Sequence, residues 1–102
     1  MTEVIKIQKR ICLNATTNVE IWLFEGTYAE IEPATNTQCY LNYLGDTYLV
    51  NYIDIFNPLE EEYLIENAFL YSTSESVLGY ITEMDGYDEN DFPSWMLVLN
   101  LI

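Results

Sequence analysis

The segment QCYLNYLGDTYLVNYI, Gln38–Ile53, predicts the β-hairpin on which the rest of the fold depends. Gly45-Asp46 separates two runs of alternating apolar and polar residues, and glycine at the first central position suits a type II′ turn. Pairing across this turn makes one face almost wholly apolar, as expected for strands buried on one side. The apolar face holds Cys39, Leu41, Tyr43, Tyr48, Val50 and Tyr52, and the other holds Gln38, Tyr40, Asn42, Thr47 and Asn51.

Three strands are expected before this hairpin, at Val4–Leu13, Val19–Phe24 and Tyr28–Pro33. The loop EGT, residues 25–27, is short enough to join the last two as an antiparallel pair, with Phe24 opposite Tyr28. In this register the inner face holds Val19, Ile21, Leu23, Ala29 and Ile31. In the same register Glu20 is expected to lie opposite Glu32. The outer face combines aromatic and acidic side chains: Glu20, Trp22, Phe24, Tyr28, Glu30 and Glu32.

The clearest helix signal lies in NPLEEEYLIENAFLY, Asn57–Tyr71. Asn57 is expected to cap the helix, Pro58 suits the first helical position, and Glu60 lies where a capping box requires it. Three consecutive glutamates then fall in the first turn, where the helix dipole favours negative charge. The apolar side expected for this helix consists of Leu64, Ile65, Ala68 and Phe69.

The C-terminal third is expected to add strands and loops. Ser72–Ser76 is typical of a loop, Val77–Thr82 of a short strand, and the nearly all-apolar Trp95–Ile102 of a central strand covered on both sides. The sequence therefore predicts an α+β fold with a mostly antiparallel sheet of five to seven strands, one main α-helix and a single compact domain over residues 1–102. One concrete version is a small SH3-like barrel formed by the first five strands.

Charge is the property that departs furthest from a typical domain. The formal net charge is −14, whereas a small soluble domain carries a magnitude of about 2–8. The only bases are Lys6, Lys9 and Arg10, and sixteen acidic residues follow them. Half of the chain is apolar and 15% is aromatic, which distinguishes it from a disordered acidic tail. Solubility and a salt-rich habitat are the simplest explanations for such acidity.

The composition argues against catalysis and against direct nucleic-acid binding. Without histidine there is no Ser-His or Cys-His pair, and there is no glycine-rich loop to hold a phosphate. Binding DNA or RNA needs Lys and Arg to neutralise phosphates. A glycosidase-type carboxylate pair remains a minor alternative. We therefore expect no enzyme, no catalytic residue and no cofactor.

The segment DGYDEND, Asp85–Asp91, is rich in the oxygen ligands that Ca²⁺ prefers. An EF-hand loop needs acids at alternate positions, glycine at the sixth and glutamate at the twelfth. Asp85, Asp88, Asn90 and Asp91 do not match that spacing. A solvated acidic loop is the preferred interpretation, and no metal site is predicted.

Cys12 and Cys39 are too few for a disulfide framework and match no metal motif. They are expected to be small buried apolar residues in a reducing compartment, with a single bridge between them left open. No signal-peptide pattern and no apolar run near the roughly 20 residues of a membrane span is present. We therefore expect a cytoplasmic protein with no membrane partner.

A folded, aromatic-rich domain of this size with almost no bases resembles the small acidic inhibitors of phages and mobile elements. They include DNA mimics that block uracil-DNA glycosylase, restriction enzymes or CRISPR effectors. The resemblance covers the whole chain and rests on size and charge, without a sequence motif. It implies an inhibitor in the host cytoplasm that binds the cationic nucleic-acid site of such an enzyme, because carboxylates accept bidentate bonds from the arginines that hold phosphate.

Two groups of carboxylates and aromatics are the expected partner-binding surface. The acidic loop supplies Glu83, Asp85, Tyr87, Asp88, Glu89 and Asp91. The outer face of the first strands supplies Glu20, Trp22, Tyr28, Glu30 and Glu32. Trp95 is a further candidate anchor, although these aromatics could equally pack under the helix or pin the loop. The alternative functions are a non-catalytic acidic module docking a basic protein, such as an immunity protein for a toxin, and an accessory domain with incidental acidity.

We expect the melting temperature to rise as NaCl is added, because the acids that follow Arg10 have no counter-charges near them in sequence. Salt weakens repulsion between exposed charges, with a Debye length of about 10 Å at 0.1 M ionic strength. Thermal melting followed by circular dichroism at increasing NaCl measures the effect. A flat or falling melting temperature would show that the carboxylates are paired or too dispersed to repel one another.

Overall fold

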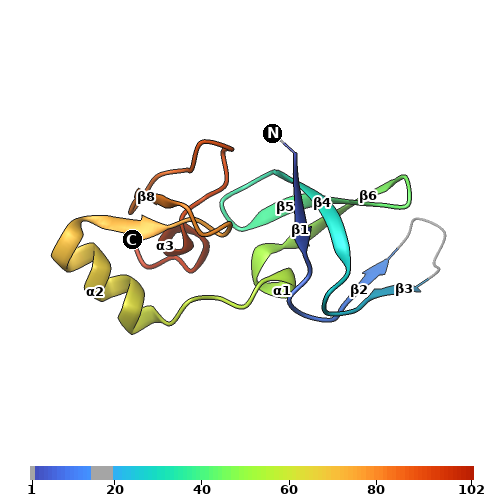
Figure 1. The fold of residues 1–102 in the computed structure, drawn as a ribbon, viewed down its shortest axis with the longest axis horizontal. Helices are drawn as coiled ribbons and strands as arrows, with labels where there is room; N and C mark the ends of the chain where they lie inside the picture. Colours follow the sequence, from blue (N-terminus) through green and yellow to red (C-terminus); the bar gives the residue numbers. More distant parts are fainter. Residues whose placement is uncertain (1, 15–19) are drawn as a thin grey trace.

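The elements of the fold lie in two groups along the long axis of the molecule (Figure 1). The computed structural model describes residues 2–14 and 20–102, and its extents are 47 × 24 × 20 Å. One group consists of a four-stranded sheet, a two-stranded sheet and a short helix, and the other consists of a longer helix, a small hairpin and the C-terminal segment. In chain order the elements are β1 (Glu3–Lys6), β2 (Ile11–Asn14), β3 (Glu20–Leu23), β4 (Tyr28–Pro33), β5 (Gln38–Tyr43), β6 (Asp46–Asn51), α1 (Tyr52–Ile55), α2 (Glu61–Tyr71), β7 (Thr73–Glu75), β8 (Ile81–Glu83) and α3 (Trp95–Val98). The predicted α+β class with mostly antiparallel strands is confirmed.

The predicted hairpin forms β5 and β6 of a four-stranded sheet with the order β1-β4-β5-β6. Its turn differs from the prediction, because Tyr43 pairs with Asp46 and the central residues are Leu44 and Gly45, both with positive φ. This change moves each cross-strand partner by two residues. Since side chains alternate with a period of two, both faces keep the predicted side chains.

The predicted pairing of Val19–Phe24 with Tyr28–Pro33 is wrong. β3 pairs with β2, and β4 pairs with β1 and β5. The register of the β1–β4 pair continues into the β2–β3 pair. Ile5 pairs with Ala29, and six residues further along the chain Ile11 pairs with Leu23, which lies six residues before Ala29. β1 and β2 are therefore two halves of one bent strand, and β3 and β4 are the halves of its partner. Glu20 consequently does not lie opposite Glu32, and Val19 lies outside the described residues.

A bulge produces the bend. The N–H of Ile7 donates to the carbonyl oxygen of Thr27 at 2.8 Å, and the N–H of Gly26 donates to the carbonyl oxygen of Ile7 at 2.8 Å. Two residues of one strand thus oppose one residue of the other, which bends a strand and increases its twist. Gly26 has a φ of 92°, a conformation that favours glycine. The loop that was expected to be a hairpin turn is this corner.

The predicted faces of these strands hold even though their partners do not. Leu23, Ala29 and Ile31 are buried, whereas Trp22 and Tyr28 are exposed. Alternation depends on local backbone geometry alone, while pairing depends on distant segments. The sheet does not close into a barrel, so the SH3-like version of the prediction is not seen.

α2 begins at Glu61, three residues later than Pro58, the predicted first helical position, and Glu60 caps it without a side-chain hydrogen bond. Asn57, the predicted cap, does not cap the helix. Its N–H donates to Oε1 of Gln8 at 2.7 Å, which connects this segment to the corner after β1. The apolar side was also wrong in part. Leu64 is buried and Ala68 is half-buried, but Ile65 and Phe69 are exposed.

The C-terminal predictions are wrong in three places. Of the strand expected at Val77–Thr82, only Ile81 and Thr82 belong to a strand, β8, and Val77–Gly79 form the turn before it. Ser72–Ser76, expected to be a loop, contains β7, which pairs with β8. Trp95–Ile102, expected to be a central strand, contains the short helix α3. Oγ of Ser94 accepts the N–H of Leu97 at 3.2 Å and caps this helix. A short apolar run fits a buried helix as well as a buried strand, and the serine cap favours the helix here.

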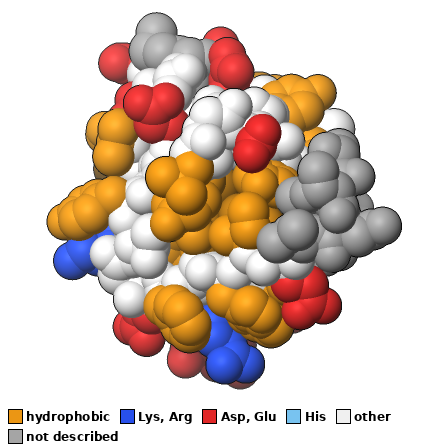
Figure 2. All heavy atoms as spheres, turned by 90° about the vertical axis from the view of Figure 1, so that its right-hand side faces the viewer, with side chains coloured by type: hydrophobic (Ala, Val, Ile, Leu, Met, Phe, Trp, Pro, Cys, Tyr) orange, Lys and Arg blue, Asp and Glu red, His pale blue; other side chains and the backbone are white. Residues whose placement is uncertain are grey.

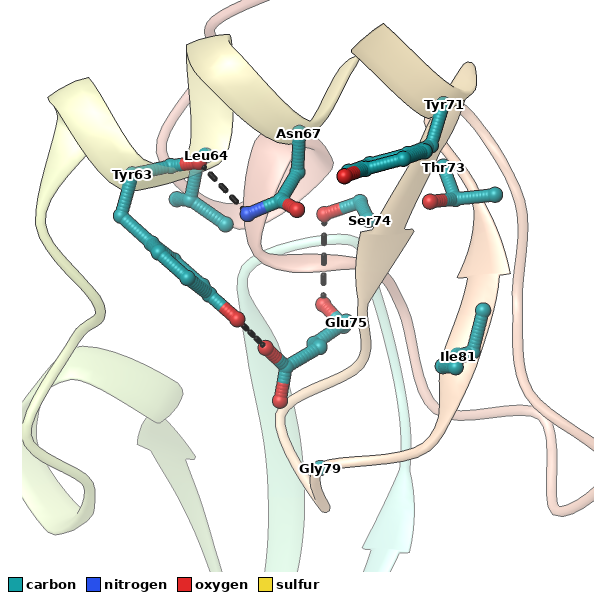
Figure 3. Close-up of a pocket in the computed structure, with 9 residues that line it drawn as sticks. All are labelled: Tyr63, Leu64, Asn67, Tyr71, Thr73, Ser74, Glu75, Gly79 and Ile81. Carbon is teal, nitrogen blue, oxygen red and sulfur yellow. Dashed lines mark hydrogen bonds between the residues drawn. The ribbon is translucent and has the colours of Figure 1, made fainter.

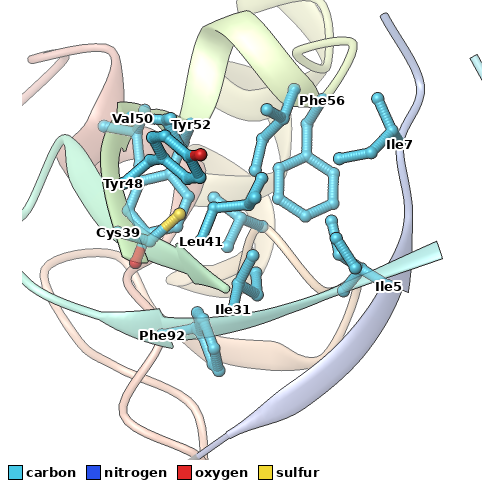
Figure 4. Packing of buried hydrophobic residues seen from close by; sticks show 14 of the residues in the cluster. Ile5, Ile7, Ile31, Cys39, Leu41, Tyr48, Val50, Tyr52, Phe56 and Phe92 are labelled. Atoms are coloured by element: carbon cyan, nitrogen blue, oxygen red, sulfur yellow. The ribbon is translucent and has the colours of Figure 1, made fainter. Parts of the chain in front are cut away.

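A cluster of aromatic rings joins the sheet to the C-terminal elements (Figure 4). The ring centroids of Tyr52 and Phe92 lie 6.4 Å apart at an edge-on angle of 71°, and those of Phe56 and Trp95 lie 6.3 Å apart at 89°. These geometries are favourable for aromatic pairs. In the described part of the chain, no helix is both long and apolar enough to cross a membrane.

Candidate functional site

Nearly all of the carboxylates lie at the surface of the molecule. All seventeen Asp and Glu residues lie in the described ranges, and only Asp88 is buried. Figure 2 shows the end of the molecule at the right of Figure 1, where apolar side chains gather in the middle and charged side chains lie around the rim. The acidity predicted from the sequence is therefore presented to solvent and not consumed in the core.

The three basic side chains all contact uncharged groups near the sheet. Nζ of Lys6 lies 5.6 Å from the ring centre of Tyr28, and the guanidinium carbon of Arg10 lies 4.7 Å from that of Trp22. Nζ of Lys9 donates to the carbonyl oxygen of Ile53 at 2.8 Å. Both aromatics predicted as anchors on the outer face thus already hold a cation, as rings commonly do.

The outer face of β4 brings together three of the predicted contact residues. Tyr28, Glu30 and Glu32 alternate along the strand with buried residues, and all three are exposed. Two predicted contact residues of this group lie elsewhere, because Glu20 and Trp22 belong to β3 beyond the corner, on the second ladder. The predicted outer surface is therefore divided between two ladders.

Backbone hydrogen bonds hold the acidic loop in one shape. The N–H of Asp88 donates to the carbonyl oxygen of Phe92 at 2.9 Å, and the N–H of Ser94 donates to that of Gly86 at 3.1 Å. The hydroxyl of Tyr87 contacts Oδ1 of Asn36 in the connection between β4 and β5. Tyr87 therefore attaches the loop to the sheet.

The predicted loop residues divide into exposed and buried side chains. The exposed carboxylates are Glu83, Asp85, Glu89 and Asp91.

Two residues expected at the partner surface point inward instead. Oδ1 of Asp88 accepts the N–H of Asn90 at 2.8 Å and that of Phe92 at 3.1 Å, and its Oδ2 is buried without a hydrogen bond. Trp95 is buried against Phe56. Asp88 therefore shapes the loop and Trp95 belongs to the core, so neither is available as a surface contact.

Sequence reasoning missed a groove between α2 and the β7–β8 hairpin (Figure 3). Its volume is about 520 Å³. The hydroxyl of Tyr63 donates to Oε2 of Glu75 at 2.7 Å, and this hydrogen bond raises the pKa of the tyrosine above its usual value. The lining residues are Tyr63, Leu64, Asn67, Tyr71, Thr73, Ser74, Glu75, Gly79 and Ile81.

A signal for this groove was present in the sequence. Tyr63, Asn67 and Tyr71 are spaced four residues apart and so lie on one side of α2. The interpretation of Ser72–Ser76 as a loop hid it, because the opposite wall is β7.

Redox and metal chemistry find little support in the described ranges. Cys12 and Cys39 are free thiols, and burial raises the pKa of Cys39 to about 12, which keeps it protonated and unreactive. No group of three or more Cys, Asp or Glu side chains suited to a metal ion is found among residues 2–14 and 20–102.

No protein-family model matches the chain, and comparisons with curated proteins and with solved structures give no match either.

Asp88→Ala is expected to lower the free energy of unfolding by about 1–3 kcal/mol, because the amides of Asn90 and Phe92 lose their side-chain acceptor. Asp88→Asn keeps an acceptor oxygen and should cost less. The exposed controls Asp85→Asn and Glu89→Gln are expected to stay within about 0.5 kcal/mol of the parent protein. Urea unfolding followed by tryptophan fluorescence measures all four. Equal stability of Asp88→Ala and the controls would contradict the structural role of this carboxylate.

Proposed function

We propose that this protein is an acidic inhibitor that binds the positively charged nucleic-acid site of a defence nuclease or DNA-processing enzyme, in place of DNA. The observation that carries the proposal is the exposure of nearly every carboxylate on a folded scaffold whose three bases contact uncharged groups. Such a surface favours a basic protein partner and disfavours nucleic acid itself.

The charge per unit length supports a comparison with DNA. Fourteen net charges over a long axis of 47 Å correspond to one charge per about 3.4 Å, which equals the axial spacing of charges along one strand of duplex DNA. Residue 1 and residues 15–19 carry no charged side chain, so this charge belongs to the described part of the chain. The protein therefore presents about half the linear charge density of a duplex.

The carboxylates are also held at defined positions. Glu30 and Glu32 project from the same face of β4, and two residues along a strand span about 7 Å. The acidic loop is closed by its own backbone hydrogen bonds and attached to the sheet through Tyr87. A preorganised surface loses less conformational freedom on binding than a flexible acidic tail. Long-range attraction to a cationic channel would also speed association.

Displacement of DNA is the direct test. The protein is added to labelled duplex bound to a panel of enzymes: guide-loaded CRISPR effector nucleases, restriction endonucleases and uracil-DNA glycosylase. We expect displacement from at least one enzyme, and simultaneous binding of duplex and protein is not expected. The proposal would be contradicted if the protein displaces duplex from none of these enzymes, or if it forms a ternary complex in which the duplex stays bound. The ternary complex would favour an acidic module that docks at another surface.

A pair of charge-matched variants tests the acidic loop within the same assay. The loop variant Asp85→Asn/Glu89→Gln/Asp91→Asn removes three exposed carboxylates, and asparagine tolerates the positive φ of Asp91. The control variant removes three carboxylates at the start of α2 as Glu60→Gln/Glu61→Gln/Glu62→Gln. The loop variant should displace duplex more weakly than the control. The reverse order would place the contact on α2 and defeat the assignment to the loop.

A further inference from the structure

The groove between α2 and the β7–β8 hairpin combines one carboxylate from β7 with two tyrosine rings from α2 (Figure 3). Glu75 is half-buried on β7, and the hydroxyl of Tyr63 fixes one of its oxygens, Oε2. Among the described residues, the second oxygen, Oε1, takes part in none of the side-chain hydrogen bonds of the groove. The tyrosine thus orients the carboxylate without neutralising its charge.

A second acceptor faces the same groove. Nδ2 of Asn67 donates to the carbonyl oxygen of Tyr63 at 2.9 Å, and its Oδ1 turns toward the interior of the groove (Figure 3). The ring of Tyr71 lies on the same side of α2, and its hydroxyl points into the groove. Ile81 lies on the opposite wall. The groove therefore offers oxygen acceptors between apolar and aromatic surfaces. None of its lining residues is basic.

None of the three basic residues of the chain reaches this groove. The contacts of Lys6, Lys9 and Arg10 are with Tyr28, Ile53 and Trp22, all outside its lining. A partly buried carboxylate that is held in place and left without a counter-charge attracts a cation more strongly than a fully solvated one. The shape and charge of the groove therefore call for a cation that is supplied by another molecule.

We propose that this groove receives an arginine side chain of the basic partner. A guanidinium group has five donors in a fixed plane, so it can bond Oε1 of Glu75 and Oδ1 of Asn67 while its face packs on a tyrosine ring. Lysine concentrates its charge on a compact and strongly hydrated ammonium, which suits flat aromatic walls less well. The volume of about 520 Å³ lies within the range of small-molecule pockets, about 300–1,000 Å³, and so leaves room for an arginine side chain. This inference rests on the proposed function, since it locates an anchor for the same partner.

The test uses the full chain labelled with ¹⁵N and titrated with Nα-acetyl-arginine amide. We expect saturable chemical-shift changes at the amides of Tyr63, Asn67, Tyr71 and Glu75. Nα-acetyl-citrulline amide has nearly the same shape without the charge, and should leave these amides unchanged. Nα-acetyl-lysine amide should bind more weakly than the arginine compound. The assignment would be overturned if the amide shifts were spread evenly over all acidic residues of the chain, or if the citrulline compound caused equal shifts.

Matched variants make the result specific to the groove. Glu75→Gln is expected to weaken binding of the arginine probe by about three- to tenfold, through loss of a charge-assisted hydrogen bond. Glu62→Gln removes the same charge from an exposed position at the start of α2, outside the groove lining, and should leave the affinity unchanged. Tyr63→Phe keeps the ring and frees the carboxylate, and it should weaken binding less than Glu75→Gln. Unchanged affinity in Glu75→Gln, with its fold confirmed by circular dichroism, would overturn the proposal.

The DNA-displacement assay separates this inference from the proposed function. If Glu75→Gln displaces duplex as strongly as the control Glu62→Gln does, the groove is not the anchor, although the inhibitor function stands. If the arginine probe binds the groove but the chain displaces duplex from no enzyme, the groove is a cation site and the proposed nuclease target is wrong.

Discussion

The edge-on contact between Tyr52 and Phe92 joins the two halves of this molecule, and the acidic loop depends on it. Tyr52 follows β6 at the end of the sheet, whereas Phe92 follows the loop directly. The amide of Phe92 bonds Oδ1 of Asp88, and its carbonyl accepts the N–H of the same residue. The ring that anchors the C-terminal half in the core thus also closes the loop that carries exposed carboxylates. Burial of a phenylalanine contributes about 1.5–3 kcal/mol, which is a large share of the stability of a small domain.

Charge repulsion is the constraint that this core must offset. Two carboxylates about 7 Å apart in water repel each other by about 0.6 kcal/mol, and Glu30 and Glu32 on β4 have roughly this spacing. The chain meets the constraint by placing its carboxylates outside and by building its core around five buried aromatic residues: Tyr48, Tyr52, Phe56, Phe92 and Trp95. The exception is Asp88, whose charge is stabilised by two backbone amides. A protein that gains nothing from its acidity would be more stable with fewer carboxylates, which is consistent with a functional use for the charge.

Local patterns predicted what depends on local geometry, and failed where distant segments decide the outcome. The faces of β5 and β6 followed from alternation, and they survived a change of turn because the shift was two residues. The partner of β3 could not be read in this way, since a three-residue loop serves as a hairpin turn or as a corner with equal ease. Trp95–Ile102 has no periodicity that separates strand from helix, and Ser94 was the overlooked signal.

The candidate site was predictable to a similar extent. The exposure of Glu30, Glu32 and most of the acidic loop follows from charge alone. The inward orientation of Asp88 depends on amides that only the folded loop brings together. One wall of the groove is β7, and its serine-rich sequence had led to the prediction of a loop. Sequence therefore supplied the proposal of a basic partner, and structure was needed to find a groove for it.

The salt dependence of affinity for a displaced enzyme tests the central claim most directly. The logarithm of the dissociation constant is measured against the logarithm of the salt concentration, for this protein and for duplex DNA on the same enzyme. Binding of duplex weakens steeply with salt because counterions are released from its phosphates. If the carboxylates occupy the DNA channel, the affinity of the protein should also fall steeply, and arginine-to-alanine changes in the channel should weaken both ligands. An affinity that is nearly independent of salt and indifferent to those arginines would contradict the account.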